Sequence, residues 1–270
     1  MSKVDVIIPV YNMANTLGRA IDSVLSQTHK DFQLVIVDDG SEDEIDSVIE
    51  KNLRSNPDKI KVLRLEKNLW RATALNRGIQ HTESKFVTFL DADDTLPEDS
   101  LEKRINFLED HPELDAIFTD TNYLDKNGRV YSIKKPKKRF LESRNWAESY
   151  LNQKLKVPFS NPSIMYRKRV FDEKTKGLSF DETLKRGQDT DLVYSLLKSC
   201  NVGYLDSITY NYHQGTYNTS ERIKNRIMAG LCKTRLLAKH TTGLKRVYLS
   251  TISIAVNIMK LAYETISYKK

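Results

Sequence analysis

The stretch KFVTFLDADD, residues Lys85–Asp94, determines how the rest of the chain is interpreted. Its apolar run, 86–90, contains aromatic and β-branched residues, which predicts a short strand buried on both faces. The run ends at three carboxylates within four residues, those of Asp91, Asp93 and Asp94. Such groups repel one another unless a cation lies among them, and a divalent metal carrying a phosphate ester would serve at the carboxyl edge of a parallel sheet. Helix capping would explain Asp94 alone, but not all three.

Predicted strands and helices alternate through the first 119 residues. Apolar runs predict strands at 4–10, 32–37, 61–65, 86–90 and 115–119. Apolar residues at helical spacing predict helices at 15–27, 45–53, 72–80 and 97–110. Connections this short indicate right-handed crossovers and a mainly parallel sheet, which binds ligands beyond its strand C-termini. Three strands end there in polar residues: Tyr11-Asn12, Asp38-Asp39 and Asp91–Asp94.

The pattern changes after about residue 120. Asn127-Gly128 predicts a β-hairpin turn, and 134–139 (KKPKKR) forms a basic loop. The remaining expected elements are a strand entered through an irregular turn at 159–167, a helix at 189–199, and short strands at 202–205 and 207–212. This part of the chain offers no simple periodic pattern from which a binding pocket could be derived.

The charge of the chain is unevenly distributed. Residues 215–270 contain eleven Lys/Arg and two Asp/Glu, whereas residues 1–214 contain 32 and 34. A basic tail favours anionic lipid, a phosphorylated acceptor or nucleic acid. No nucleic-acid-binding motif accompanies the tail, so we rank nucleic acid last and expect none to bind.

Two helices are expected in the tail, at 222–239 and 244–268. The second has an apolar stripe, but its uncharged part, 247–259, is 13 residues long. That is short of the roughly 20 residues that a membrane-spanning helix needs. The helix could lie in a membrane interface, pack on its own domain, or pack on a second subunit as a homodimer.

Length and composition fit one domain with an appendage. The chain has 270 residues and 39% hydrophobic content, which supports an ordinary core. Cys200 and Cys232 are too few for a disulfide framework and lack metal-site spacing, which favours reduced thiols. The first residues lead directly into a predicted strand without a signal-peptide pattern. We therefore expect a cytoplasmic protein, at the inner face of the membrane if the tail binds lipid.

Five motifs together resemble the family 2 inverting glycosyltransferases, which have the GT-A fold. They are VDVIIPVYN (Val4–Asn12), VIVDDGS (Val35–Ser41), NLWRATALNRGI (Asn68–Ile79), FLDADD (Phe89–Asp94) and RGQDTDL (Arg186–Leu192). They extend over residues 4–213 in the order and spacing of the family. The resemblance implies an α/β, Rossmann-like GT-A domain at 1–215. Its nucleotide-binding half would be 1–119 and its acceptor-binding half 120–215, followed by a basic helical tail at 216–270.

The resemblance also implies roles for individual residues. It places the nucleotide among eight of them: Pro9, Tyr11, Asn12, Asp38, Asp39, Arg71, Asp91 and Ala92. Tyr11 would stack on the base, and Asp39 would accept a hydrogen bond from a ring N–H. Asp93 would ligate Mn²⁺ or Mg²⁺, and His213 would be a further ligand of the metal or the diphosphate. Asp189 would be the catalytic base.

The reaction implied by the resemblance transfers a sugar from a nucleotide-sugar donor, expected to be a UDP-sugar. The acceptor would be a glycan or a lipid-linked molecule of surface polysaccharide or glycoconjugate synthesis. A metal would offset charge on the leaving diphosphate, and one carboxylate would take the acceptor proton, with inversion at the sugar carbon. A second hypothesis is a catalytically weak, nucleotide-sugar-binding partner of another glycosyltransferase. Its support is Gln188, at a position where the family usually has Glu.

Several alternatives remain open from the sequence. Trp70 stands where a glycine is common in the family, and it could narrow the donor pocket, stack on a sugar or pack outward. Asp191 is a rival base, although it would point away from Asp189 on one helix. Asp39 could belong only to a turn, Asp189 could only cap a helix, and His213 could be a hydrogen-bonded surface residue.

Overall fold

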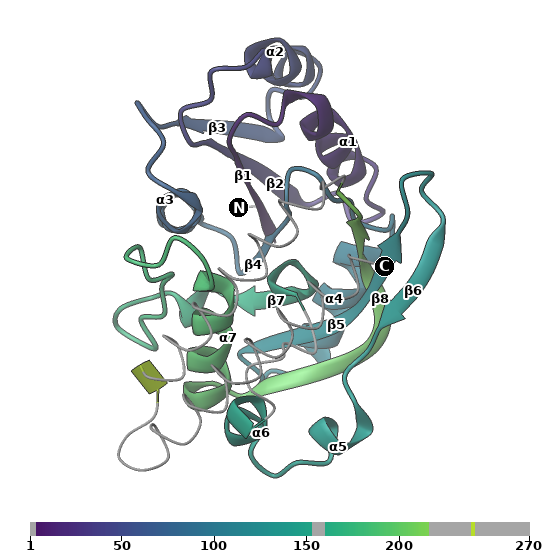
Figure 1. Cartoon of the computed structure of the whole chain (residues 1–270), viewed down its shortest axis with the longest axis vertical. Helices are drawn as coiled ribbons and strands as arrows, with labels where there is room; N and C mark the ends of the chain where they lie inside the picture. The colour runs from purple at the N-terminus through teal and green to yellow at the C-terminus, as the bar shows by residue number, and fades with distance from the viewer. Residues whose placement is uncertain (1–3, 153–159, 216–238, 241–270) are drawn as a thin grey trace, which may run out of the picture.

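The computed structural model describes residues 4–152, 160–215 and 239–240, and its centre is an eight-stranded sheet (Figure 1). The strands are β1 (Val4–Val10), β2 (Phe32–Asp38), β3 (Ile60–Arg64), β4 (Phe86–Phe89), β5 (Ala116–Leu124), β6 (Val130–Lys134), β7 (Ile164–Arg167) and β8 (Val202–His213). The helices are α1 (Ala14–Leu25), α2 (Ile45–Ser55), α3 (Arg71–Gln80), α4 (Ser100–Asp110), α5 (Lys138–Leu141), α6 (Trp146–Asn152) and α7 (Gln188–Ser199). Two 3₁₀ turns, η1 (Asn161–Ser163) and η2 (Lys168–Val170), flank β7.

The sheet is mostly parallel, as the sequence predicts. Its order is β3-β2-β1-β4-β7-β5-β6, with β8 paired to β5. The pairs β1–β2, β1–β4, β2–β3 and β5–β8 are parallel, whereas β7 and β6 pair antiparallel with their neighbours. Parallel pairing brings the ends of β1, β2 and β4 to one edge, where the polar residues that follow these strands lie together.

Each face of the sheet is covered by its own set of helices. Along β1 the side chains alternate, so Val6 and Ile8 pack with residues of α1 and α4, whereas Ile7 packs with residues of α3 and α7. All seven residues of β1 are buried, which explains why its sequence is apolar on both faces except for Asp5, whose buried carboxylate accepts hydrogen bonds from Glu83 and Ser84. In Figure 1 the N-terminal strands occupy the upper half, and α7 and most of β8 lie below them.

The predicted hairpin turn at Asn127-Gly128 is confirmed, because β5 and β6 pair antiparallel across it. Asp125 Oδ1 accepts hydrogen bonds from the backbone amides of Asn127 (2.8 Å) and Arg129 (2.9 Å). Gly128 has φ 75°, a conformation that glycine adopts readily. The sequence pattern of β-branched and aromatic residues around a turn was sufficient here.

Several predicted boundaries differ from the structure. The strand expected at 115–119 continues to Leu124, and the strand expected at 159–167 begins at Ile164, after η1. The two short strands expected at 202–205 and 207–212 are one strand, β8, which crosses an irregularity opposite Thr119 and Asp120. A bulge places one extra residue in a strand without ending its pairing, so the polar Asp206 does not interrupt β8. The helix expected from residue 97 begins at Ser100 instead.

The two predicted tail helices lie outside the described residues, apart from Lys239 and His240. Within the described parts of the chain, no helix is long and apolar enough to cross a membrane.

Candidate functional site

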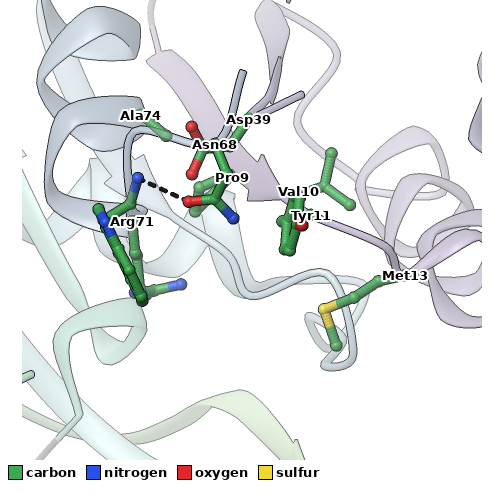
Figure 2. A pocket seen from close by; sticks show the side chains of 9 residues that line it. Pro9, Val10, Tyr11, Met13, Asp39, Asn68, Arg71 and Ala74 are labelled. Atoms are coloured by element: carbon green, nitrogen blue, oxygen red, sulfur yellow. Dashed lines mark hydrogen bonds between the residues drawn. The ribbon is translucent and has the colours of Figure 1, made fainter. Parts of the chain in front are cut away.

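A cavity of about 550 Å³ opens beyond the carboxyl ends of β1 and β2 (Figure 2). Its lining residues are Pro9, Val10, Tyr11, Met13, Asp39, Asn68, Trp70, Arg71 and Ala74. Four of the predicted nucleotide-binding residues therefore surround one space: Pro9, Tyr11, Asp39 and Arg71. The lining combines apolar and aromatic walls with two charged side chains, a composition typical of pockets for organic ligands.

Asp39 is held by the loop that precedes α3. The residue is 3% exposed, its Oδ1 accepts a hydrogen bond from the Leu69 amide (2.8 Å), and the nearby Trp70 amide also favours its ionised form. Burial raises the pKa of Asp39, and the two amide bonds oppose that effect. Gly40 has φ 74°, and a Cβ there would lie 2.6 Å from the backbone of Lys67. This close approach requires glycine, so Asp39 is part of a packed junction between two loops and not only of an isolated turn.

Asp38, Asn12 and Ala92 lie near the cavity, but they are not among its lining residues. Asp38 Oδ1 accepts the Ser41 amide (2.9 Å) and so supports the turn after β2. Asn12, with φ 52°, accepts the Glu42 amide on Oδ1 (2.8 Å) and joins the loops after β1 and β2. Ala92 is buried between the acidic residues that follow β4.

Asp91, Asp93 and Asp94 form an acidic cluster after β4, in which one oxygen from each lies within 4.8 Å of the others. Burial and the carboxylate of Asp91 raise the pKa of Asp93. Burial and both neighbouring carboxylates raise the pKa of Asp94 to about 8. Closely spaced carboxylate oxygens with raised pKa values are the donor set that a hard divalent cation would stabilise, so these residues fit Mg²⁺ or Mn²⁺.

The three carboxylates of this acidic cluster have different protein partners. Asp94 accepts hydrogen bonds from the His213 backbone amide (2.7 Å) and from the Tyr210 hydroxyl. Asp91 pairs with Arg71 at 2.5 Å between Oδ1 and Nη2. The carboxylate of Asp93 bonds to its own backbone amide. Asp93 is therefore the member of the cluster most available to an added cation.

Arg71 connects the cavity, the acidic cluster and Asp189. It lines the cavity and forms the ion pair with Asp91. Burial alone would lower the pKa of Arg71, but the carboxylates of Asp91 and Asp189 outweigh it and raise the pKa. The guanidinium thus stays charged between two carboxylates that come from distant parts of the sequence.

Asp189 lies in the first turn of α7, which begins after Gly187 (φ 84°). Gly187 is the N-cap, so Asp189 does not occupy the capping position. Within the described parts of the chain, its buried Oδ1 has no hydrogen-bond partner. Burial is the main cause of the raised pKa of Asp189; Arg71 opposes it and Asp91 adds to it. A carboxylate with a raised pKa and an unpaired oxygen is well suited to accept a proton.

Asp191, the rival base, has a different environment. His240 Nε2 lies 2.6 Å from its Oδ1, and Lys239 Nζ lies 3.0 Å from its Oδ2. Burial alone would raise its pKa, but these two hydrogen bonds lower it. Both carboxylate oxygens of Asp191 are therefore bonded to the tail residues Lys239 and His240, whereas Asp189 interacts electrostatically with Arg71. The expectation that the two carboxylates point in different directions is confirmed by these contacts.

His213 reaches the acidic cluster through its backbone rather than its ring. Its Nε2 lies 3.0 Å from Thr95 Oγ1, and burial lowers its pKa. Among the described residues, the group able to hold a metal contains the three aspartates and not His213. The sequence reasoning missed Arg19, whose Nη2 donates to the Asp93 carbonyl oxygen (2.5 Å), because it lies on the polar side of α1 and carries no motif.

Comparison with known proteins matches residues 5–175 to the family model described as glycosyl transferase family 2. An uncharacterized glycosyltransferase of Rickettsia felis is 33% identical over 207 residues, covering 76% of this chain and 32% of that protein. One from Methanocaldococcus jannaschii is 30% identical over 190 residues, covering 70% of this chain and 62% of that protein. The chain spans about a third or less of the length of the first three curated relatives.

Solved structures with a similar fold include two sugar-nucleotide complexes. Staphylococcus aureus TarS 1–349 in complex with UDP-GlcNAc has a TM-score of 0.64 at 21% identity, covering 92% of this chain and 69% of that one. Mannosyltransferase PcManGT from Pyrobaculum calidifontis, in complex with GDP-Man and Mn²⁺, has a TM-score of 0.65 at 16% identity, covering 97% and 75%. At these identities the likeness concerns the fold.

Proposed function

The chain belongs to glycosyl transferase family 2, and from that premise we propose that it is a metal-dependent inverting enzyme using a nucleotide-sugar donor. The donor we propose is a UDP-sugar, and the acceptor is a glycan or lipid-linked molecule of surface polysaccharide or glycoconjugate synthesis. One observation carries the proposal: Arg71 lines the cavity, forms an ion pair with Asp91 and interacts electrostatically with Asp189. Donor pocket, acidic cluster and base are thereby parts of one site.

The cavity accounts for the nucleotide. Tyr11, which is 40% exposed, offers an aromatic face to a base, and Asp39 offers a carboxylate to a ring N–H. Asp39 is fixed where its loop meets the backbone of Lys67 at Gly40, and Asn12, which follows Tyr11, accepts the Glu42 amide, so we expect the pocket to need little reordering on binding.

The acidic cluster accounts for the diphosphate. Asp93 would hold a divalent cation, with Asp91 and Asp94 beside it. A bound Mn²⁺ or Mg²⁺ supplies positive charge that offsets the charge developing on the leaving diphosphate. His213 remains our candidate for a further ligand of the metal or the diphosphate, through a ring that now bonds to Thr95.

Asp189 accounts for activation of the acceptor. Its unpaired Oδ1 would accept the proton of the acceptor hydroxyl, and such assistance typically contributes ~10²–10⁴-fold to a rate. Arg71 favours the ionised form of Asp189, because it lowers the pKa of that carboxyl against the larger, opposite effect of burial. A single base without a protein nucleophile gives attack opposite the leaving group, and therefore inversion.

The proposal is tested by following donor consumption with purified protein, Mn²⁺ and a panel of UDP-sugars. We expect turnover to be lost with EDTA and in Asp93→Ala, and to be retained in Asp58→Ala, which removes an exposed carboxylate outside the site. Turnover that is indifferent to EDTA and to Asp93→Ala would rule out the metal role.

A catalytically weak partner protein is the second candidate function. Gln188, 7% exposed with an unpartnered Oε1, favours it, because a neutral amide stands beside the proposed base. Metal-dependent UDP binding without turnover over a broad acceptor panel, combined with turnover in Gln188→Glu, would support this alternative. Turnover by the unaltered protein excludes it.

We also propose that the basic tail makes peripheral contact with the inner face of the membrane through 244–268, where lipid-linked acceptors would lie. Removing residues 241–270 retains Lys239 and His240, so the contacts with Asp191 are preserved. The shortened protein should move from the membrane fraction to the soluble fraction. A full chain that is soluble in the same fractionation contradicts this proposal.

A further inference from the structure

Trp70 has a backbone conformation that is unfavourable for any residue other than glycine. It immediately precedes α3 with φ 74° and ψ 153°. This combination is sparsely populated because a Cβ crowds the neighbouring backbone. A tryptophan held there needs an interaction that offsets the cost, and such outliers gather at ligand-binding sites.

Packing within the described residues does not offset that cost. The side chain of Trp70 is 49% exposed, and Trp70 belongs to neither hydrophobic core. The loop itself is well fixed. The Trp70 amide donates to Asn68 Oδ1 (3.0 Å), and the Trp70 carbonyl accepts from the Ala74 amide (3.2 Å). The preceding amide, that of Leu69, donates to Asp39 Oδ1 (2.8 Å). The backbone is therefore held in place while the indole projects outward.

The indole has two neighbours of interest. Lys185 Nζ lies 4.2 Å from the ring centroid, an attractive cation–π contact from the loop before α7. The ring also lines the cavity together with Tyr11, whereas Lys185 is not among the described lining residues. Lys185 thus ties the ring to the part of the chain that carries Asp189 and leaves it available to the cavity.

We propose that Trp70 is a nucleotide-contacting residue, which gives the donor cavity a second aromatic wall, besides Tyr11, for the planar nucleobase. The inference rests on the proposed function. The nucleobase is favoured over the sugar because the residue before Trp70, Leu69, donates its amide to Asp39 Oδ1 (2.8 Å), at the proposed base-recognising end of the cavity. The carboxylates proposed to hold the diphosphate, Asp91 and Asp93, do not line this cavity among the described residues. Stacking on an aromatic ring is open to every base because each has a π-face.

The test is calorimetric titration of UDP and GDP, each with Mn²⁺, into the full chain and its variants. Trp70→Phe and Trp70→Ala both keep a Cβ, so both variants retain the unfavourable positive φ. They differ in that only Trp70→Phe keeps an aromatic ring. We expect Trp70→Ala to weaken nucleotide binding about tenfold and Trp70→Phe to stay within about threefold of the unaltered protein. Tyr131→Ala, which removes an exposed ring outside the cavity, should bind normally.

Trp70→Gly separates ligand binding from folding. It relieves the unfavourable φ, so the thermal midpoint without nucleotide should stay the same or rise while affinity falls. Equal nucleotide affinity in the unaltered protein and Trp70→Ala overturns the inference, as does a lower thermal midpoint for Trp70→Gly. A loss seen with UDP-GlcNAc or GDP-Man but not with UDP or GDP places the ring against the sugar and overturns the nucleobase assignment.

The inference and the proposed function fail in different ways. If the unaltered protein binds neither nucleotide in the presence of Mn²⁺, the proposed function fails, and the inference fails with it. If the unaltered protein binds one of them and the Trp70 variants bind it equally well, the inference alone fails.

Discussion

The polar side chains on the proposed donor side of the site are hydrogen-bonded within the protein, whereas polar atoms on the proposed acceptor side are left unpaired. On the donor side, Asp38, Asp39 and Asn12 accept backbone amides of neighbouring loops. Near the proposed base, Gln188 Oε1 and Asp189 Oδ1 are buried and have no hydrogen-bond partner among the described residues, whereas the buried Arg71 Nη2 and Asp91 Oδ1 form an ion pair with each other. Buried polar atoms are nearly always paired, so this contrast supports our proposal that the donor pocket is preformed and that the groups around Asp189 gain hydrogen bonds from the acceptor.

The largest expected effect tests the unpaired oxygen of Asp189. Asp189→Asn should lower turnover by ~10²–10⁴-fold, because an amide cannot take the acceptor proton. Donor affinity should change little, since the donor side is organised without Asp189. Rates and nucleotide affinity are measured on the same preparation.

Asp191→Asn is the matched control for that substitution. It alters a carboxylate two residues away that is occupied by Lys239 and His240, and it should retain most of the turnover. A collapse of turnover in Asp191→Asn with Asp189→Asn still active would reverse the assignment of the base.

The donor side is tested by Gly40→Ala. A Cβ at Gly40 would lie 2.6 Å from the Lys67 backbone and would demand a positive φ, so unfolding should become easier by ~2–3 kcal/mol or more. Gly128→Ala provides the comparison, because its φ is 75° but no atom lies within 4 Å of the added Cβ. Gly128→Ala should lower the free energy of unfolding by only about 1 kcal/mol. Chemical denaturation measures both, and equal losses would mean that the loops at Gly40 are not tightly packed.

The electrostatic coupling between Arg71 and Asp189 is tested by the pH dependence of turnover. Asp189 must be ionised to accept a proton, and its raised pKa means that turnover is lost as pH falls through a range above that of an ordinary aspartate. Arg71 lowers the pKa of Asp189, so Arg71→Met should raise that pKa. The acidic limb of the pH–rate profile, where turnover falls with falling pH, should then move to higher pH. An unchanged limb in the pH–rate profile would show that Asp189 and Arg71 are not coupled.

The smallest expected effect comes from Gln188→Met. Because Gln188 Oε1 has no partner, an apolar side chain of similar size should change folding stability by less than about 0.5 kcal/mol. The apparent acceptor KM should rise if Oε1 contacts the acceptor. A clear loss of stability would show that Gln188 has a structural role, and would weaken the contrast between the two sides.

Most of the fold could be predicted from the sequence, and the family resemblance is confirmed. The strand 4–10 was located from its apolar run, and three polar strand ends were expected at one edge because parallel strands bring their carboxyl ends together. The antiparallel insertion of β7 between β4 and β5 was not predictable, because non-local pairing leaves no periodic signal in a four-residue strand.

The site was less accessible to sequence reasoning than the fold. The motifs predicted residues such as Asp39 and Arg71, which the structure brings to one cavity, although their roles in binding remain predictions. The contact of Arg19 with the Asp93 carbonyl depends on the orientation of a helix. The hydrogen bonds of Lys239 and His240 with Asp191 join residues that are 48 and 49 positions apart. Neither arrangement has a local signature, because each is created by tertiary folding.

The attachment of Lys239 and His240 to Asp191 also sets a geometric limit. The 30 residues that follow cannot reach farther than about 100 Å from that anchor, even fully extended. Whatever residues 241–270 bind would therefore lie within that distance of the start of α7. Tethering over such a range corresponds to an effective concentration of roughly millimolar order or below, so a weakly bound surface or molecule would meet the same domain repeatedly.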